Sequence, residues 1–316
     1  MNFARVAELV DALVSNTCGF TPVPVRLRSR ALFFSQIVPI SKNITVDIFA
    51  EKSLTVDVFT PNQKVNFPVA VFLHGFKGFK DWGFFPFMHG VFTSEGIALV
   101  TVNFSHNGVN EHHPTDFVDL DAFSQNTISQ ELVETKSVIE WVIQFASEYG
   151  WDPGAITLIG HSRGGGEALV YASNDARINK VVAWAPISDF GLAFKDIGKE
   201  KWKTEGQIFV PNARTQQKMP MKYAFWDDLE TNHQSLNILE AVPYIEMPMM
   251  LLHGEKDESV SVEHSNKIYA QCLHAVLITV PEATHTFNAG HPFSESSKFP
   301  IQLQDVLVNT VEFILD

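Results

Sequence analysis

The chain has 316 residues, of which 45% are hydrophobic and 19% are charged, a composition typical of a packed globular protein. Its 23 basic and 36 acidic side chains give a formal net charge of −13, which would repel nucleic acid and anionic lipid surfaces. Neither nucleic acid nor a membrane is therefore expected as a partner.

The cysteines and the first residues bear on location. Cys18 and Cys272 are too few for a disulfide framework and form no CxxC pair for a metal site. Arg5, Glu8 and Asp11 interrupt the segment where a signal peptide needs an unbroken apolar core, and no run of about 18 apolar residues occurs. These observations predict a cytoplasmic protein that is not exported.

Residues 1–35 differ in pattern from the rest of the chain. A short amphipathic piece is followed by CGFTPVPVRLRSRA, with two prolines and three arginines, and the stretch resembles peptides translated from a transfer RNA gene. We interpret it as an N-terminal arm that is either disordered or foreign to the native protein, with a genuine surface arm as the alternative. Residues 36–316 are then expected to form one domain.

Two kinds of strand pattern follow in chain order. ITVDIF and LTVDVF alternate apolar and polar residues, which predicts a hairpin of half-buried strands. Continuous apolar runs, typical of strands buried on both faces, then occur at 67–75, 96–104, 155–160, 181–186, 249–254 and 275–280.

Helical patterns separate these runs and complete an α/β arrangement. They lie around 84–95, 128–148, 163–173, 262–272 and 301–315. This alternation predicts a mostly parallel sheet with helices on both faces. The interval of about 190–247 breaks the rhythm, and we interpret it as an inserted cap.

The stretch ITLIGHSRGGGEALVYA carries the clearest chemical signal. A strand pattern ends in GHSRG and a helix pattern begins at once, the arrangement of a nucleophile elbow with Ser162 at its tip. Gly160 and Gly164 would remove side chains that collide around the turn. The alternative is a glycine-rich structural turn; a dinucleotide-binding GxGxxG is excluded because serine stands at its third position.

A nucleophilic serine needs a base and a carboxylate that orients the base, in the chain order Ser, acid, His. His285 follows the last predicted core strand and is the expected base, with His291 in reserve. Asp257 follows the strand before it and is the expected acid, with Asp189 as the competitor.

An oxyanion hole requires two N–H donors. The backbone amide of Arg163, next after the serine, is one candidate. The amide of Phe76, in the glycine-rich HGFKG after an earlier strand, is the other, although an ordinary loop would have the same composition. No cluster of metal ligands is found, and neither metal nor cofactor is expected.

Aromatic residues of the predicted cap are candidates for substrate binding, although packing of the insertion itself explains them as well. These residues are Phe209, Tyr223, Phe225 and Trp226.

Six segments together resemble the α/β-hydrolase superfamily over residues 40–316. HGFKGFKDWG, NFSHNGV, GHSRGGGEAL, NARTQQKMP, HGEKDESV and ATHTFNAGHPF are similar to bacterial serine hydrolases grouped with dienelactone hydrolases and acyl esterases. The resemblance implies an eight-stranded, mostly parallel sheet, a Ser-Asp-His triad and ester hydrolysis without a cofactor. Dienelactone hydrolases proper resemble the chain less, because they use cysteine where this sequence has Ser162.

The sequence thus predicts a serine hydrolase that cleaves a small carboxylic ester through an acyl-enzyme. Alternatives are a thioesterase, an amidase or an acyltransferase with the same triad and, from another class, a binding protein of this fold without chemistry. Because the chain is strongly acidic, neutral esters are expected to be better substrates than anionic ones. The oligomeric state is not indicated.

Overall fold

The computed structural model describes residues 40–47, 54–62, 66–272, 274–294 and 296–316. These residues belong to one compact unit. The interpretation of residues 1–35 falls outside the described residues and stays a prediction.

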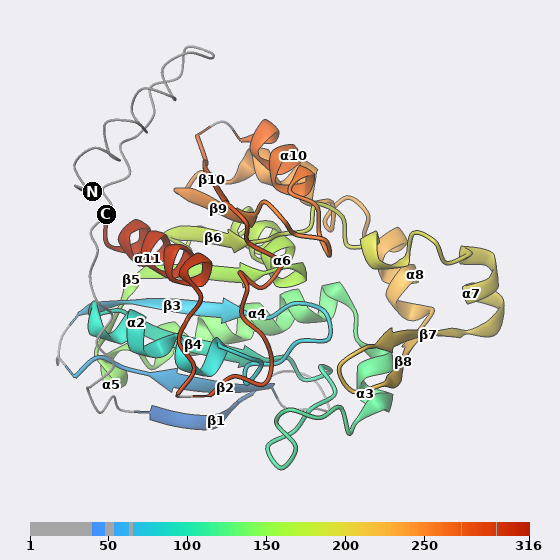
Figure 1. Cartoon of the computed structure of the whole chain (residues 1–316), viewed down its shortest axis with the longest axis horizontal. Helices are drawn as coiled ribbons and strands as arrows, with labels where there is room; N and C mark the ends of the chain where they lie inside the picture. Colours follow the sequence, from blue (N-terminus) through green and yellow to red (C-terminus); the bar gives the residue numbers. More distant parts are fainter. Residues whose placement is uncertain (1–39, 48–53, 63–65, 273, 295) are drawn as a thin grey trace, which may run out of the picture. The chain divides into compact units, whose positions relative to one another are not determined.

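An eight-stranded sheet runs through the unit (Figure 1). Across the sheet the strands are β1 (Ile40–Val46), β2 (Leu54–Phe59), β4 (Ala98–Asn103), β3 (Phe67–Leu73), β5 (Trp151–His161), β6 (Lys180–Trp184), β9 (Met249–Gly254) and β10 (Val276–Val280). The second strand in this order pairs antiparallel with its two neighbours, β1 at the edge and β4, and the six strands from β4 onward pair parallel with one another. The predicted mostly parallel sheet is confirmed.

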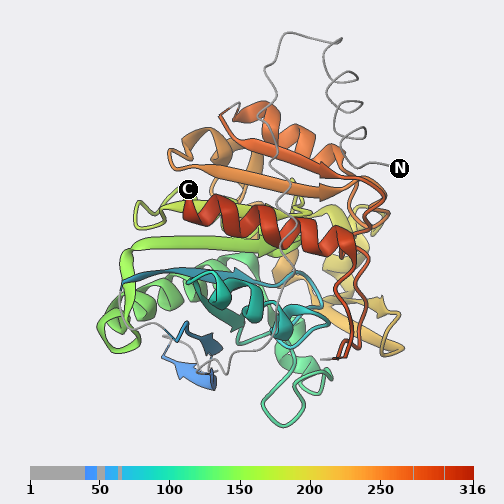
Figure 2. The same cartoon turned by 60° about the vertical axis from the view of Figure 1, so that its left-hand side comes forward.

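Helices cover both faces of the sheet, as Figures 1 and 2 show from two directions: α2 and α11 lie on one face, and α4 and α6 on the other. Strands between two such layers are dry on both sides, and every residue of β4 and β9 is buried. The helices outside the insertion are η1 (Phe85–Phe87), α2 (His89–Ser94), α3 (Leu120–Gln125), α4 (Ile128–Gln144), α5 (Ala146–Tyr149), α6 (Arg163–Ala172), α10 (Glu263–Gln271) and α11 (Ile301–Leu315). None of the helices in the described ranges is long and apolar enough to span a bilayer.

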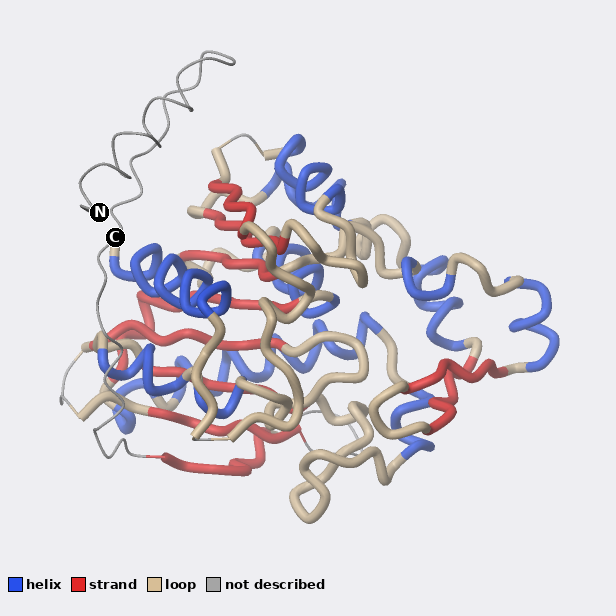
Figure 3. Tube along the Cα trace, viewed as in Figure 1, coloured by secondary structure: helices blue, strands red, loops and turns tan. Residues whose placement is uncertain are grey.

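The segment between β6 and β9 carries a small two-stranded sheet apart from the main one (Figure 3). Its hairpin is tied to the segment before α3, because Arg214 Nη1 donates to the Thr115 carbonyl (2.9 Å) and Gln217 Nε2 donates to the Phe117 carbonyl (2.9 Å). The elements of this insertion are η2 (Leu192–Phe194), α7 (Lys199–Glu205), β7 (Gln207–Asn212), β8 (Gln217–Lys222), α8 (Ala224–Thr231), α9 (Ile238–Ala241) and η3 (Val242–Tyr244).

A buried ion pair anchors the loop that follows β3. Lys80 Nζ lies 3.0 Å from Asp57 Oδ2 on β2 and 2.6 Å from Asp81 Oδ2, and the Lys80 backbone N–H donates to Asn103 Oδ1 at the end of β4 (2.7 Å). Lys80 and Asp57 are both almost fully buried. The loop is therefore attached to two neighbouring strands by contacts that water does not screen.

Replacing Asp57 by alanine should lower the free energy of unfolding by about 3 kcal/mol, because it leaves the buried Lys80 ammonium with one carboxylate instead of two. Urea unfolding followed by tryptophan fluorescence measures the change. The exposed pair of Lys136 and Glu140 (3.8 Å) provides the control, and Glu140→Ala should cost less than about 1 kcal/mol. Equal losses in the two variants would contradict the anchoring role.

Candidate active site

Ser162 lies at the turn where β5 ends and α6 begins. Its φ of 59° and ψ of −117° are angles that a residue with a side chain adopts only when surrounding contacts enforce them. The Ser162 N–H donates to the Trp184 carbonyl (2.8 Å), and its own carbonyl accepts from Gly165 N–H (3.0 Å) and Gly166 N–H (3.2 Å). These bonds hold the strained residue at the carboxyl edge of the sheet.

Two glycines make room for this turn. A Cβ atom on Gly160 would lie 1.9 Å from the Gly164 carbonyl oxygen, and one on Gly164 would lie 2.5 Å from the His74 carbonyl oxygen. Both obstacles are backbone atoms, which cannot rotate away as a side chain would. The turn therefore needs glycine at both positions, as the steric interpretation of GHSRG predicts.

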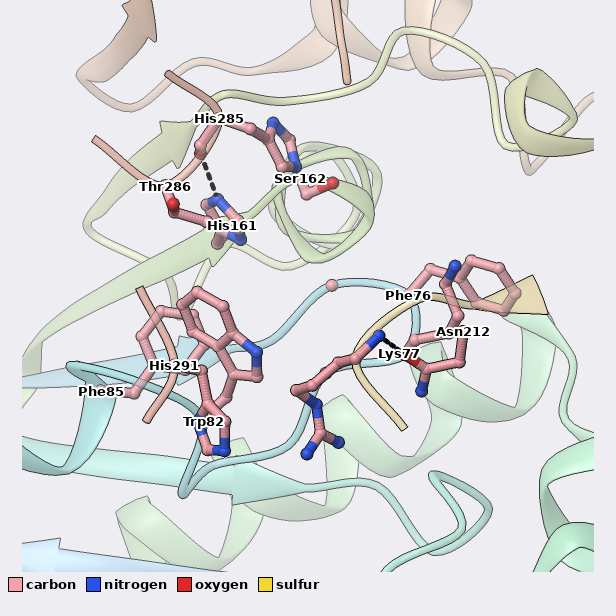
Figure 4. Close-up of a pocket in the computed structure, with 13 residues that line it drawn as sticks. Phe76, Lys77, Trp82, Phe85, His161, Ser162, Asn212, His285, Thr286 and His291 are labelled. Carbon is pink, nitrogen blue, oxygen red and sulfur yellow. Dashed lines mark hydrogen bonds between the residues drawn. The ribbon is translucent and has the colours of Figure 1, made fainter. Parts of the chain in front are cut away.

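Asp257 and His285 come together from the loops after β9 and β10. His285 Nδ1 lies 2.7 Å from Asp257 Oδ2. A carboxylate can only accept, so Nδ1 carries the proton and Nε2 keeps its lone pair. Figure 4 shows the His285 ring beside the Ser162 side chain, in the same pocket.

Asp257 is held in its ionised form. The backbone N–H groups of Ser259 (2.9 Å) and Val260 (2.8 Å) donate to Oδ1, and His253 Nε2 lies 3.2 Å from Oδ2. Burial acts to raise the pKa of Asp257, but the hydrogen bonds from His253 and His285 outweigh it and hold that pKa well below its usual range. A permanently charged acceptor therefore fixes the tautomer of His285.

His161 holds the loop that carries His285 through a hydrogen bond to its backbone. Its Nε2 donates to the His285 backbone carbonyl (2.9 Å), and burial lowers the pKa of His161 to about 3. The ring is thus a neutral hydrogen-bond donor at ordinary pH.

The amides of Phe76 and Arg163 flank Ser162. The loop with Phe76 passes directly against the serine, since a Cβ on Gly75 would lie 2.9 Å from the Ser162 Cβ. Arg163 is the first residue of α6, where backbone N–H groups have no acceptor within the helix and the helix dipole is positive. The arrangement suits the binding of a negatively charged oxygen next to Ser162.

The Arg163 side chain enters a buried group of carboxyls. Its Nη2 lies 2.6 Å from Glu131 Oε1 and its Nε 3.2 Å from Glu167 Oε1, with both glutamates fully buried. Burial opposes ionisation of Glu131, but the charge of Arg163 together with hydrogen bonds from Glu167 and Asn126 lowers the Glu131 pKa. Burial and the charge of Glu131 raise the pKa of Glu167 well above its usual value, so the group carries one ion pair and one neutral acid.

A pocket of about 340 Å³ opens over Ser162 and His285 (Figure 4). Its walls come from the loop after β3, from the loop after β10 and from the turn of the β7–β8 hairpin. Besides the serine and its neighbours, the lining includes Phe76, Lys77, Trp82, Asn212, Arg214 and His291.

The four cap aromatics do not line this pocket. Phe225 is fully buried against Phe194, with ring centroids 5.0 Å apart, and Phe209 is 55% exposed. Tyr223 and Trp226 pack around Trp202, the other aromatic in the centre of the insertion. The insertion contributes its hairpin turn to the pocket instead, since Phe225 is buried in its interior and Phe209 faces solvent.

The reserve candidates have other partners. Asp189 forms an exposed ion pair with Lys195 (3.4 Å), whereas Asp257 contacts His285. His291 lines the pocket, but its Nδ1 accepts from Gly83 N–H (2.8 Å).

Sequence reasoning missed the buried glutamates and the polar pocket residues. Glu131 and Glu134 lie on the same face of α4 as the buried Val138, so acidic residues at apolar helical positions were the available signal. Asn212 and Arg214 lie in NARTQQKMP, one of the segments that carry the family resemblance, but the local pattern did not place them at the site, because a hairpin of the insertion brings them there.

Fold and site together define an α/β-hydrolase. A family model described as BD-FAE matches residues 56–272, and the chain belongs to this family. The resemblance seen in the sequence is thereby confirmed.

Several individual proteins are similar to this chain in fold or in part of the sequence. Est1E from Butyrivibrio proteoclasticus, in a structure described with ferulic acid bound, superposes with a TM-score of 0.64 at 18% identity over 86% of this chain and 98% of that one. Dienelactone hydrolase from Anabaena variabilis gives a TM-score of 0.55 at 16% identity over 88% and 97%. The para-nitrobenzyl esterase of Bacillus subtilis is 30% identical over 119 residues, 37% of this chain and 23% of that protein.

The chain matches only 15–40% of the length of these curated relatives. Among the described residues, no cluster of three or more His, Cys, Asp or Glu side chains could hold a metal ion.

Gly160→Ala should destabilise the protein by about 4 kcal/mol or prevent folding, because the new Cβ meets backbone 1.9 Å away. Gly290 is a matched control, because a Cβ added there would have no atom within 4 Å, and Gly290→Ala should change stability by less than about 1 kcal/mol. Urea midpoints compare the two. A Gly160→Ala protein with the parental midpoint would show that the turn can relax.

Stability should fall as the pH drops from about 6.5 to 4, because burial lowers the pKa of His74 to about 4. Over that window the unfolded chain binds a proton on His74 that the folded chain does not, which favours unfolding. His74→Asn keeps a donor near the Nδ1 position, which lies 3.0 Å from the Gly75 carbonyl oxygen. Between pH 6.5 and 4, the slope of the unfolding free energy against pH should be smaller in His74→Asn than in the parental protein, by about 1.4 kcal/mol per pH unit. An unchanged slope would contradict this role of His74.

Proposed function

We propose that the protein hydrolyses a carboxylic ester through an acyl-enzyme on Ser162, with His285 as general base and Asp257 as the residue that orients it. The observation that carries the proposal is the 2.7 Å contact of Asp257 with His285 Nδ1, which leaves Nε2 unprotonated beside a serine held on a strained turn. Membership of the BD-FAE family and the similarity to esterases support the reaction class.

Acylation begins when Ser162 Oγ attacks the ester carbonyl. His285 Nε2 takes the hydroxyl proton, and the positive charge that forms on the ring is stabilised by ionised Asp257. The carbonyl oxygen becomes negative and accepts hydrogen bonds from the N–H groups of Phe76 and Arg163.

Collapse of this intermediate expels the alcohol, which takes its proton from His285 Nε2. Water then attacks the acyl-enzyme while His285 Nε2 accepts its proton, and the second intermediate collapses by breaking the bond between the acyl carbon and Ser162 Oγ. The acid is released as His285 returns the proton to Ser162 Oγ. Every proton in this cycle passes through one ring nitrogen, so the fixed tautomer matters for both halves.

The buried side chain of Arg163 contributes by position. Its pairing with Glu131 fixes the first turn of α6, and hence the direction of the Arg163 N–H toward Ser162. Pre-set donors of this kind need no reorganisation when charge develops.

Ser162→Ala and His285→Ala should each lower turnover of 4-nitrophenyl butyrate by up to about 10⁶-fold, and Asp257→Asn by about 10⁴-fold, because the three residues act as one unit. Asp189→Asn serves as the matched control and should stay near parental activity. Loss of activity in Asp189→Asn, with retention in Asp257→Asn, would move the acid to the loop after β6.

A fluorophosphonate probe gives an independent measurement. It should label the parental protein and Asp189→Asn but not Ser162→Ala, as read by intact-protein mass spectrometry. Labelling at another residue, or none in the parental protein, would contradict the proposal and favour a binding protein of this fold.

A further inference from the structure

The pocket over Ser162 is cationic although the chain is acidic. None of the 13 described residues that line it is Asp or Glu, whereas Lys77 and Arg214 both belong to the lining. The net charge of −13 is spread over the whole protein, and a Debye length of about 8 Å confines each charge to its surroundings at physiological salt. Lys77 and Arg214 are therefore the permanently charged side chains among the described residues that line this pocket.

Lys77 follows the proposed oxyanion donor Phe76 directly. Its Nζ donates to the Pro211 carbonyl (3.1 Å), which uses one of the three ammonium N–H groups. Within the described part of the chain no carboxylate lies at ion-pair distance from it. Two N–H groups of the Lys77 ammonium therefore remain for another acceptor, and its positive charge is not neutralised by a carboxylate.

Arg214 is held by neutral partners. Nη1 donates to the Thr115 carbonyl (2.9 Å), and the guanidinium carbon lies 5.1 Å from the Phe79 ring centroid and 5.6 Å from that of Phe117. The charge of Asp116 acts on Arg214, but this exposed carboxylate forms no ion pair with it in the described structure. The guanidinium is thus oriented without being neutralised.

Asn212 supplies an independent sign of a missing acceptor. It lines the pocket with 7% of its surface exposed, and its Nδ2 is buried without a hydrogen-bond partner among the residues described. The Oδ1 atom accepts from the backbone N–H of Arg214 (3.2 Å), which fixes the orientation of the amide. A buried donor without a partner is costly, and a ligand oxygen would satisfy it.

We infer that the ester substrate carries a carboxylate, which Lys77, Asn212 and Arg214 bind while Ser162 attacks the ester carbonyl. The inference rests on the proposed hydrolysis and narrows its substrate class. It reverses the expectation that neutral esters are preferred, because the local charge of the pocket counts for more than the net charge of the chain.

Two matched substrate pairs test the inference, one for each side of the ester. Mono-4-nitrophenyl adipate and 4-nitrophenyl hexanoate differ by a carboxylate on the acyl chain. The pair 4-carboxyphenyl butyrate and 4-(methoxycarbonyl)phenyl butyrate differs on the alcohol. In at least one pair the charged member should have a kcat/KM about 10-fold higher, and added salt should reduce that preference.

Variants connect the preference to the residues. Lys77→Gln and Arg214→Gln should each lower the charged-to-neutral ratio of kcat/KM by about 10-fold, and Arg214→Lys should restore part of it. The control is Lys201→Gln on α7, which removes a side chain that is 72% exposed and should leave the ratio unchanged. Preference for the neutral member in both pairs, or a ratio insensitive to both glutamine variants, would overturn the inference.

Failure of the inference and failure of the proposed function give different results. Fluorophosphonate labelling with turnover of the neutral esters would keep the hydrolase and discard the carboxylate. If no ester is cleaved, calorimetric titration of monomethyl adipate into Ser162→Ala still decides the binding claim. Binding that Arg214→Gln weakens supports it, and absence of binding overturns it.

Discussion

The site depends on one steric constraint, the passage of backbone across backbone at Ser162. A Cβ atom on Gly160 would collide with the Gly164 backbone, and one on Gly164 would collide with the backbone of Leu73 and His74. This close approach holds Ser162 at the carboxyl edge of the sheet in a strained backbone conformation, immediately before the first residue of α6. The loops after β3, β9 and β10 begin at the same edge of the sheet because their strands run parallel. Their side chains therefore lie near Ser162.

The buried charged side chains near Ser162 lie next to groups of opposite charge or hydrogen-bond donors. Asp257 is enclosed by two histidines and two backbone amides, and Arg163 by Glu131 and the neutral Glu167. Opposite charges and hydrogen-bond donors placed next to these buried ions limit the cost of removing them from water. Lys77 and Arg214 differ from these groups, because their charges face the pocket with backbone carbonyls and aromatic rings as their partners.

The sequence predicted the parts of the site that local pattern encodes. Ser162, Asp257 and His285 could be located because each lies shortly after an apolar run, and the topology of a parallel sheet brings such positions together. The cap residues could not be located in this way. Phe225 and Phe209 have the same aromatic chemistry, yet one fills the interior of the insertion and the other faces solvent, and only the path of the hairpin decides which. The role of Glu167 could not be predicted either, because its burial depends on contacts with Arg163 and with Glu131, which lies on another helix.

The turn between β7 and β8 has a consequence for how this protein can diverge. It places Asn212 and Arg214 in the lining of the pocket over Ser162, while its bonds to the segment before α3 do not involve Ser162, Asp257 or His285. Under the carboxylate inference, substitutions in this short turn would change which acids are admitted without changing those three residues. Natural selection could then alter substrate choice separately from reactivity, and descendants of one ancestral enzyme could come to use different nutrients through the exchange of a few side chains.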